Sequence, residues 1–431
     1  MAGFIRERVL KASYRLEAIG FLLLLGYLVF IPSGPYPIPI IAGLNLDVFL
    51  GILLCAFVVI YSSRITRYPN LLIETWLLYF FIVFISAILS VDFDYSIRYA
   101  FVIFGYSLTA LLVPVIYVNR ADAIRKWLFL AAILVSILII YLHFVHGVGQ
   151  EYRFWLISVD MPRGDAGEMG YDTVDPNMTA AGLVLSLIAY FPSIFVKRRW
   201  IVPELLGSLL ILEACVITLS RSAILAFAVA IGFSYVIVLT RSLGGGTGFV
   251  MKKSMAISFF LALVVISSGV LIVLSVAPGI VDNLAYRFIR VFDDSARIAL
   301  MLKSWTTFTA DIKTIVIGSG FMTENPHNEY LRTISTMGFL GVFSSILFHG
   351  AMFYIAIRQC AHNSRRLFSV LSIISFMMVA AMFYGYTKLM WVAWMFLMFS
   401  YTESRFMFRQ TRNFKVDTGS EDRQLVGIGL S

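Results

Sequence analysis

The chain has 431 residues, of which 60% are hydrophobic and only 14% are charged, with a net charge of +9 at pH 7. Soluble domains carry about 25% charged residues, so this composition excludes an ordinary soluble domain. The basic residues stand in short clusters between apolar blocks, which indicates membrane topology rather than binding of nucleic acid. We therefore expect no nucleic acid among the partners of the chain.

The apolar blocks are about 20 residues long, the length that a helix needs to cross a ~30 Å hydrocarbon core. No alternating strands of ~10 residues, as in a membrane β-barrel, are present. We predict an all-α integral membrane protein with about 12 transmembrane helices, forming one polytopic domain over residues 1–410. The predicted spans are 17–33, 38–61, 70–90, 97–118, 127–146, 178–196, 201–219, 222–240, 254–276, 333–357, 367–386 and 389–403.

Lysine and arginine residues predict the orientation of these spans. With the N-terminus in the cytoplasm, every cytoplasmic segment is basic, as the positive-inside rule requires. Both termini are then cytoplasmic, and residues 411–431 form a polar tail that we expect to be disordered. Two long loops, 147–177 and 277–332, lie on the outer side. The second is too small for an ordinary domain but could form short helices over the mouth of the membrane domain.

Several arginines on the outer side depart from the positive-inside rule. Arg221 stands in Ser220-Arg221-Ser222 between two spans, and Arg287, Arg290 and Arg297 share the second outer loop. A guanidinium group binds phosphate oxygens in a bidentate manner, so the cluster is a candidate site for an anionic lipid headgroup such as a pyrophosphate. The alternative is that these side chains snorkel to the interface or pair with nearby aspartates. The residues alone leave both interpretations open.

A second candidate is His327, in Pro326-His327-Asn328-Glu329-Tyr330-Leu331 at the outer entrance to the tenth span. An imidazole with a pKa near 6.5 suits a general base at neutral pH. The competing interpretation is a capping or interfacial histidine. Asn177, in Asp175-Pro176-Asn177 at the start of the sixth span, has an equally good interpretation as part of a helix N-terminus. Glu213 could pair with a polar group or orient the site. No acidic metal-binding motif stands out, so we expect neither a metal nor a cofactor.

These pieces together resemble the O-antigen ligase and polymerase superfamily of bacterial inner membranes. In chain order, the matching motifs are Asp175-Pro176-Asn177, Ser220-Arg221-Ser222, Arg297 with Trp305 before Gly318-Ser319-Gly320-Phe321, and His327-Asn328-Glu329-Tyr330-Leu331 before Gly338-Phe339-Leu340-Gly341. The last two are the most specific, and the resemblance covers mainly residues 170–360. In one departure, Ser222-Ala223 stands where the family often has two glycines.

The resemblance implies a C-type glycosyltransferase-like bundle in the bacterial inner membrane, with both outer loops and the active site in the periplasm. It implies a metal-independent, inverting glycosyltransferase that moves a glycan from undecaprenyl pyrophosphate to an acceptor sugar hydroxyl. The acceptor is lipid A–core for a ligase, or a growing glycan for a polymerase of O-antigen, capsule or exopolysaccharide. By position, His327 would be catalytic and activate the acceptor hydroxyl. The substrate-binding candidates are Arg221, Arg297, Arg290, Arg287, Asn328 and Asn177.

Three functions stay open at this point. A ligase is favoured over a polymerase because the sequence has one compact arginine and histidine cluster and no second basic outer patch to hold a growing chain. A secondary transporter or lipid flippase is the third, since twelve spans with both ends inside is a common transporter layout. Transporters place polar residues near the membrane midplane in matching halves, whereas these gather at the outer face.

Overall fold

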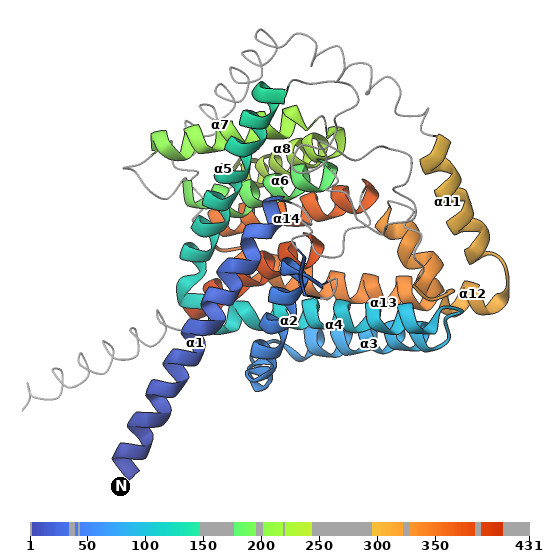
Figure 1. Ribbon diagram of the computed structural model, residues 1–431, viewed down its shortest axis with the longest axis horizontal. Coiled ribbons are helices and arrows are strands. Elements are labelled where there is room, and N and C mark those ends of the chain that lie inside the picture. Colours follow the sequence, from blue (N-terminus) through green and yellow to red (C-terminus); the bar gives the residue numbers. More distant parts are fainter. Residues whose placement is uncertain are drawn as a thin grey trace, which may run out of the picture.

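The computed structural model describes residues 2–33, 39–41, 44–146, 176–194, 201–218, 220–243, 295–321, 328–383 and 389–407. This part of the chain is helical apart from one small antiparallel pair of strands (Figure 1). The strands are β1 (Pro39–Ile41) and β2 (Leu44–Asn45). The helices are α1 (Ala2–Ser33), α2 (Leu46–Val59), α3 (Asn70–Ile88), α4 (Phe93–Ile116), α5 (Ala121–His146), α6 (Pro176–Ile194), α7 (Ile201–Ile217), α8 (Arg221–Leu243), α11 (Ser295–Phe308), α12 (Ile312–Ile317), α13 (Glu329–Cys360), α14 (Ser364–Phe383) and a last helix over 389–407.

Among the described residues, five helical stretches are long and apolar enough to cross a membrane. They are Arg15–Pro32, Asn70–Ile88, Phe93–Ile116, Val118–Tyr141 and Glu329–Cys360. Four shorter helices are also apolar. The chain is thus an α-helical protein with several apolar helices of membrane-spanning length, as its composition predicts. The total of twelve spans stays a prediction, and the predicted span 254–276 and the tail 411–431 lie outside the described residues.

The prediction of a helix from residue 38 is wrong at its start. Residues 39–45 contain the β1–β2 pair, and α2 begins only at Leu46. Pro35, Pro37 and Pro39 precede it, and proline lacks the backbone N–H that a helix interior needs. Only Asn45 and Asp47 interrupt the apolar run there, which is why hydropathy alone extended the predicted helix too far.

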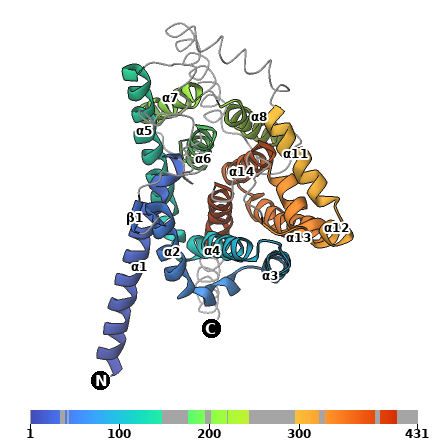
Figure 2. The ribbon, with the colours of Figure 1, turned by 45° about the vertical axis from the view of Figure 1, so that its right-hand side comes forward.

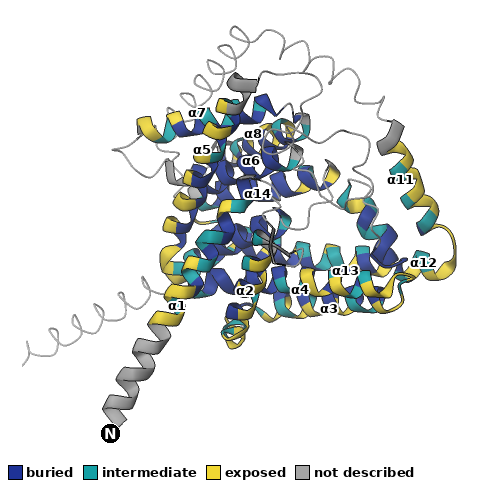
Figure 3. Ribbon diagram, in the orientation of Figure 1, coloured by how far each residue is buried: buried dark blue, intermediate teal, exposed yellow. Residues whose placement is uncertain are grey.

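The helices pack with their buried residues inward and their exposed residues outward (Figure 3), and many of the exposed residues are large and apolar. α14 packs on α8, α13 on α3, and α5 against α1, α6 and α7. The two short helices of the second outer loop, α11 and α12, lie beside α13 in both ribbon views (Figure 2). Exposed residues such as Leu22, Leu134 and Ile346 are large and apolar, as expected for helix faces that contact lipid tails rather than water.

Segments that the charge pattern assigns to the cytoplasm contact one another. Arg64 pairs with Glu17 at 3.3 Å, and the guanidinium group of Arg125 binds both carboxylate oxygens of Glu403 at 2.7 and 2.8 Å. Arg366 donates to the Ser404 hydroxyl at 3.0 Å. These contacts join α1 to the segment Ser62–Arg67, and join α5 and α14 to the last helix, at their predicted inner ends.

Segments assigned to the outer side also contact one another. Lys313 of α12 donates to the Leu89 carbonyl, just after the end of α3, at 2.7 Å. A cation at a helix C-terminus satisfies a carbonyl that has no partner within the helix and is favoured by the helix dipole. The Ser96 hydroxyl in the first turn of α4 donates to the Phe321 carbonyl at 2.7 Å. The described part of the predicted second outer loop is therefore held next to the α3–α4 turn at Lys313 and Phe321.

Candidate functional site

Most of the residues predicted from the sequence to form the site are not placed by the structure. His327, Arg287 and Arg290 lie outside the described residues. For the other two arginines and Asn177 only the backbone is described: Arg221 begins α8, Arg297 is in the first turn of α11, and Asn177 is in the first turn of α6. Whether these side chains converge, and the roles assigned to them, stay predictions.

Asn328 is the predicted site residue whose side chain is described. It is the N-cap of α13, and its Oδ1 atom accepts a hydrogen bond from the Leu331 N–H at 3.0 Å. Its Nδ2 atom donates to the Met382 carbonyl at 3.1 Å. Two residues further along α13, the Tyr330 hydroxyl donates a hydrogen bond to the Met378 carbonyl of α14 at 3.1 Å. Asn328 therefore starts α13 and, with Tyr330, ties its first turn to the end of α14.

The two most specific motifs of the sequence meet in the structure. α13 is broken at Gly338, whose backbone has φ +64° and ψ −163°. Next to this break, the backbone N–H groups of Ser319 and Gly320 donate to the carbonyls of Ser335 and Thr336, both at 3.0 Å. A helix break leaves carbonyls without partners, and the Gly318–Phe321 segment supplies donors for two of them.

Glycine is required at this junction because two backbones touch. Gly318, Gly320 and Gly338 all have positive φ, a region that other residues rarely adopt. A Cβ atom on Gly338 would come 2.5 Å from the Val316 carbonyl carbon, and one on Gly318 would come 2.2 Å from the backbone of Thr336. The glycines of the two motifs thus fix the position of the first turns of α13.

An ion pair lies in these first turns of α13. The Arg332 Nη1 atom is 3.5 Å from the Glu329 Oε2 atom. Arg332 also donates a hydrogen bond to the Tyr99 hydroxyl of α4, and its guanidinium carbon lies 4.9 Å from the centre of the Tyr99 ring. Arg332 is buried, and the Glu329 side chain is 27% exposed. The Glu329 Oε2 atom itself is buried and accepts no hydrogen bond from the described residues.

Glu329 lines a cavity of about 590 Å³ whose wall is mostly apolar. The cavity lies along the kinked α13 and is closed by α14 and the last helix, with Trp305 of α11 on its edge. Its rim has exposed side chains, among them Trp305, Tyr330, Ile346 and Met378. A cleft of this size with a few polar groups is typical of sites for organic ligands.

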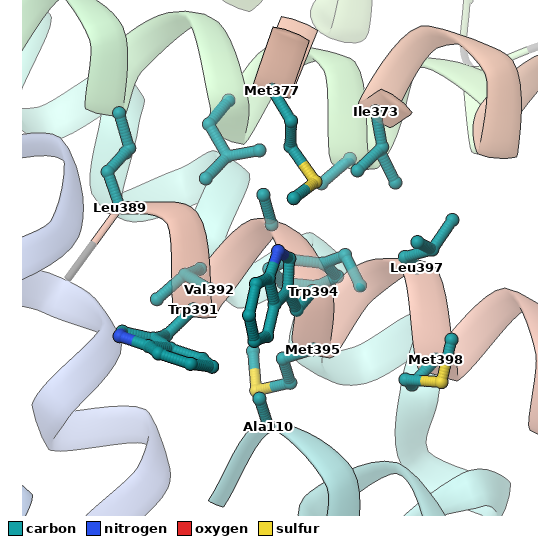
Figure 4. Packing of buried hydrophobic residues seen from close by; sticks show 14 of the residues in the cluster. Ala110, Ile373, Met377, Leu389, Trp391, Val392, Trp394, Met395, Leu397 and Met398 are labelled. Atoms are coloured by element: carbon teal, nitrogen blue, oxygen red, sulfur yellow. The ribbon is translucent and has the colours of Figure 1, made fainter. Parts of the chain in front are cut away.

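The deep part of the cavity contains a cluster of aromatic rings. Trp391 and Trp394 pack edge to face, with ring centres 3.9 Å apart, and Trp394 packs in the same way on His349 at 4.6 Å. The Nδ1 atom of His349 lies 2.7 Å from the Ser345 carbonyl. If Nδ1 carries the proton, Nε2 is left as the acceptor of a neutral imidazole. Figure 4 shows the two indole rings within the packed core.

Sequence reasoning did not single out Glu329, Arg332, Tyr99 or His349. Two signals were available: Glu329 and Arg332 are charged residues at the entrance to the predicted span 333–357, where a charge is a candidate for function, and they have the i, i+3 spacing of a helical ion pair. The contact with Tyr99, 233 residues earlier in the chain, has no such local signal. Among the described residues, no three His, Cys, Asp or Glu side chains are placed to hold a metal ion, and metal-independent chemistry stays a prediction.

Comparison with models of protein families and with curated protein sequences gives no match for this chain. The family that the motifs resemble is therefore not shown by relatives.

Proposed function

We propose that the chain is a membrane glycosyltransferase of the O-antigen ligase type, which moves a glycan from undecaprenyl pyrophosphate to a sugar hydroxyl of lipid A–core. One observation carries the proposal. The first turn of α13, which follows directly from His327, forms part of the wall of a large apolar cavity and lines it with the Glu329 side chain, whose carboxylate is paired with Arg332. An apolar cavity next to the polar and charged N-terminus of a helix suits a substrate that has a hydrocarbon tail and a glycan headgroup.

The chemistry divides between two substrates, the pyrophosphate-linked donor and the sugar acceptor. Pyrophosphate is a good leaving group whose developing charge must be neutralised, and the arginines predicted to bind it, Arg221 and Arg297, would do so. The acceptor hydroxyl is a poor nucleophile, and a base would accelerate its attack by roughly 10²–10⁴. In this proposal His327 is that base, and the Glu329 carboxylate accepts a hydrogen bond from the acceptor sugar.

The rigidity of the site supports the same assignment. Arg332 joins Glu329 to α4, Asn328 joins the helix start to α14, and the glycine junction fixes α13 to the Gly318–Phe321 segment. A first turn held at three points keeps its side chains in one geometry, which is what positioning two reactants requires. The mutual contacts of the predicted outer segments support a site on the periplasmic side.

The experiment that separates ligase from polymerase is deletion of the gene, followed by a gel of surface glycans and carrier-linked glycans. Loss of a ligase leaves long chains on the carrier lipid and bare lipid A–core. Loss of a polymerase instead leaves single repeat units, and that pattern would replace the ligase assignment by the polymerase. Unchanged surface and carrier-linked glycans would contradict both.

A further inference from the structure

Two arginine–glutamate pairs of the chain differ in how closely their side chains approach. At the predicted inner end, Arg125 binds both carboxylate oxygens of Glu403, at 2.7 and 2.8 Å. At the start of α13, the Arg332 Nη1 atom stays 3.5 Å from the Glu329 Oε2 atom, and that oxygen accepts no hydrogen bond from the described residues. The first pair is closed, with two parallel hydrogen bonds, and the second is open.

Tyr99 of α4 accounts for this difference. The Nη2 atom of Arg332 donates a hydrogen bond to the Tyr99 hydroxyl, and the guanidinium carbon lies 4.9 Å from the centre of the Tyr99 ring. A guanidinium group is a rigid planar fork. With Nη2 turned toward Tyr99, the group does not present Nη1 and Nη2 together to Glu329, and the pair stays open.

The Tyr99 ring is held independently of the ion pair. It stacks on Tyr95 of the same helix, with ring centres 6.0 Å apart, and packs on Phe321 at 4.8 Å. The Phe321 carbonyl accepts a hydrogen bond from Ser96 of α4. The position of the Tyr99 hydroxyl is therefore set by α4 and the Gly318–Phe321 segment. Removing the hydroxyl alone should leave the packing of the ring in place.

The open pair matters for the cavity, because Glu329 lines it. The Glu329 side chain is 27% exposed, against 16% for that of the closed Glu403. A carboxylate that binds a guanidinium group through both oxygens has fewer acceptor positions left for a ligand. The open pair engages Glu329 at Oε2 and leaves Oε1 to accept a hydrogen bond from a hydroxyl group.

We propose that Tyr99 is a positioning residue for binding of the sugar acceptor. Its hydroxyl holds Arg332 in the open pair, and the Glu329 Oε1 atom then accepts a hydrogen bond from a hydroxyl of the acceptor. The role in acceptor binding rests on the proposed function, whereas the open pair does not.

A first test measures the ion pair in the purified full-length protein without substrate. In Tyr99→Phe the ring remains, but Arg332 loses a hydrogen-bond acceptor. A buried donor without an acceptor is unfavourable, so the guanidinium group should turn to Glu329 and close the pair. Glu329→Gln should then lower the melting temperature about twice as much in Tyr99→Phe as in the wild type, because two hydrogen bonds replace one contact. An equal or smaller fall would overturn the open pair.

A second test measures transfer with the concentrations of acceptor and donor varied separately. Tyr99→Phe should raise the KM for the acceptor by about tenfold, as expected for loss of one hydrogen bond to a charged group, and leave the KM for the donor unchanged. In the Glu329→Gln background, Tyr99→Phe should change the acceptor KM no further, because Tyr99 acts through Glu329. KM does not depend on the amount of folded enzyme, so partial loss of folded protein does not change it.

Tyr354→Phe is the matched control for both tests. It removes a tyrosine hydroxyl that accepts a hydrogen bond from Arg358 at 3.2 Å, near the predicted inner end of α13. Both KM values should stay at the wild-type level, and the effect of Glu329→Gln on the melting temperature should not change.

A wild-type acceptor KM for Tyr99→Phe, or an increase that is equally large with Glu329→Gln, would overturn the positioning role. A wild-type protein that transfers no glycan to any acceptor would instead contradict the proposed function. The melting temperatures would still decide in that case whether Tyr99 keeps the pair open.

Discussion

The guanidinium group of Arg332 lies 3.5 Å from the carboxylate of Glu329, one turn earlier in α13. The pair stands at the point where a predicted catalytic segment enters the helix bundle. Arg332 is held in turn by Tyr99 of α4, so the position of Glu329 in the cavity wall depends on a residue from the N-terminal part of the chain.

Replacing Glu329 by glutamine should slow glycan transfer by about tenfold to a hundredfold, because a hydrogen bond to a charged acceptor contributes about 1.5–3 kcal/mol. Glutamine keeps the shape of the side chain but removes the charge that pairs with the buried Arg332, so we expect some loss of stability and compare transfer per folded protein. The measurement is the rate of transfer by the purified variant. The matched control is Glu74→Gln, which changes an exposed carboxylate of α3. An equal rate for Glu329→Gln and the wild type would remove Glu329 from the site.

Replacing Arg332 by methionine should lower the free energy of unfolding by about 2 kcal/mol, since it leaves the Glu329 carboxylate in the protein without its cation. Adding Glu329→Gln to Arg332→Met should recover part of that loss. Thermal unfolding of the four proteins in detergent gives a double-mutant cycle. Additive effects of the two changes would mean that the two side chains do not interact.

Replacing Gly338 by alanine should destabilise the protein by at least about 2 kcal/mol. Gly338 has positive φ, and the new Cβ atom would overlap the backbone at Val316. Neither of the two backbone segments can therefore move away without a substantial cost in free energy. Gly232→Ala, with open space and a helical neighbourhood, should instead be neutral or stabilise by about 0.5–1 kcal/mol. Melting temperatures measured side by side check both; an unaltered Gly338→Ala protein would exclude a tight junction.

Membrane orientation can be measured with single cysteines in a variant that lacks Cys55, Cys215 and Cys360. Val91, in the α3–α4 turn, is 92% exposed and should react with a membrane-impermeant maleimide added to intact spheroplasts. Ser63, an exposed residue before α3, should react only after the membrane is opened. Labelling in the reverse order would contradict the predicted orientation and the periplasmic site.

The positions of most helices follow from hydropathy, because twenty apolar residues in a row can satisfy their backbone only as a helix. Two local features could not be read this way. The β1–β2 pair lies inside a mostly apolar run, where the prolines, Gly43 and Asn45 are the signals of a break. The kink of α13 depends on Gly338, and glycine inside an apolar helix is common enough that its positive φ was not evident.

The site is less predictable than the fold because its contacts join distant parts of the chain. The motifs around Gly318 and Gly338 could each be recognised in the sequence. The backbone hydrogen bonds between them are a tertiary contact, which the sequence of either motif does not show. Arg332 and Tyr99 are 233 residues apart, and the aromatic floor of the cavity comes from the last helix. None of these contacts leaves a pattern of spacing in the sequence.

We propose that His327, Arg221 and Arg297 act together in glycan transfer from a polyprenyl pyrophosphate. The most direct measurement incubates the purified protein in liposomes with labelled undecaprenyl-pyrophosphate glycan and lipid A–core, and follows the label. We predict transfer by the wild type, no transfer but intact donor binding for His327→Ala, and weakened donor binding for Arg297→Ala. Full activity of both variants, or movement of the donor across the membrane without transfer by the wild type, would contradict the account.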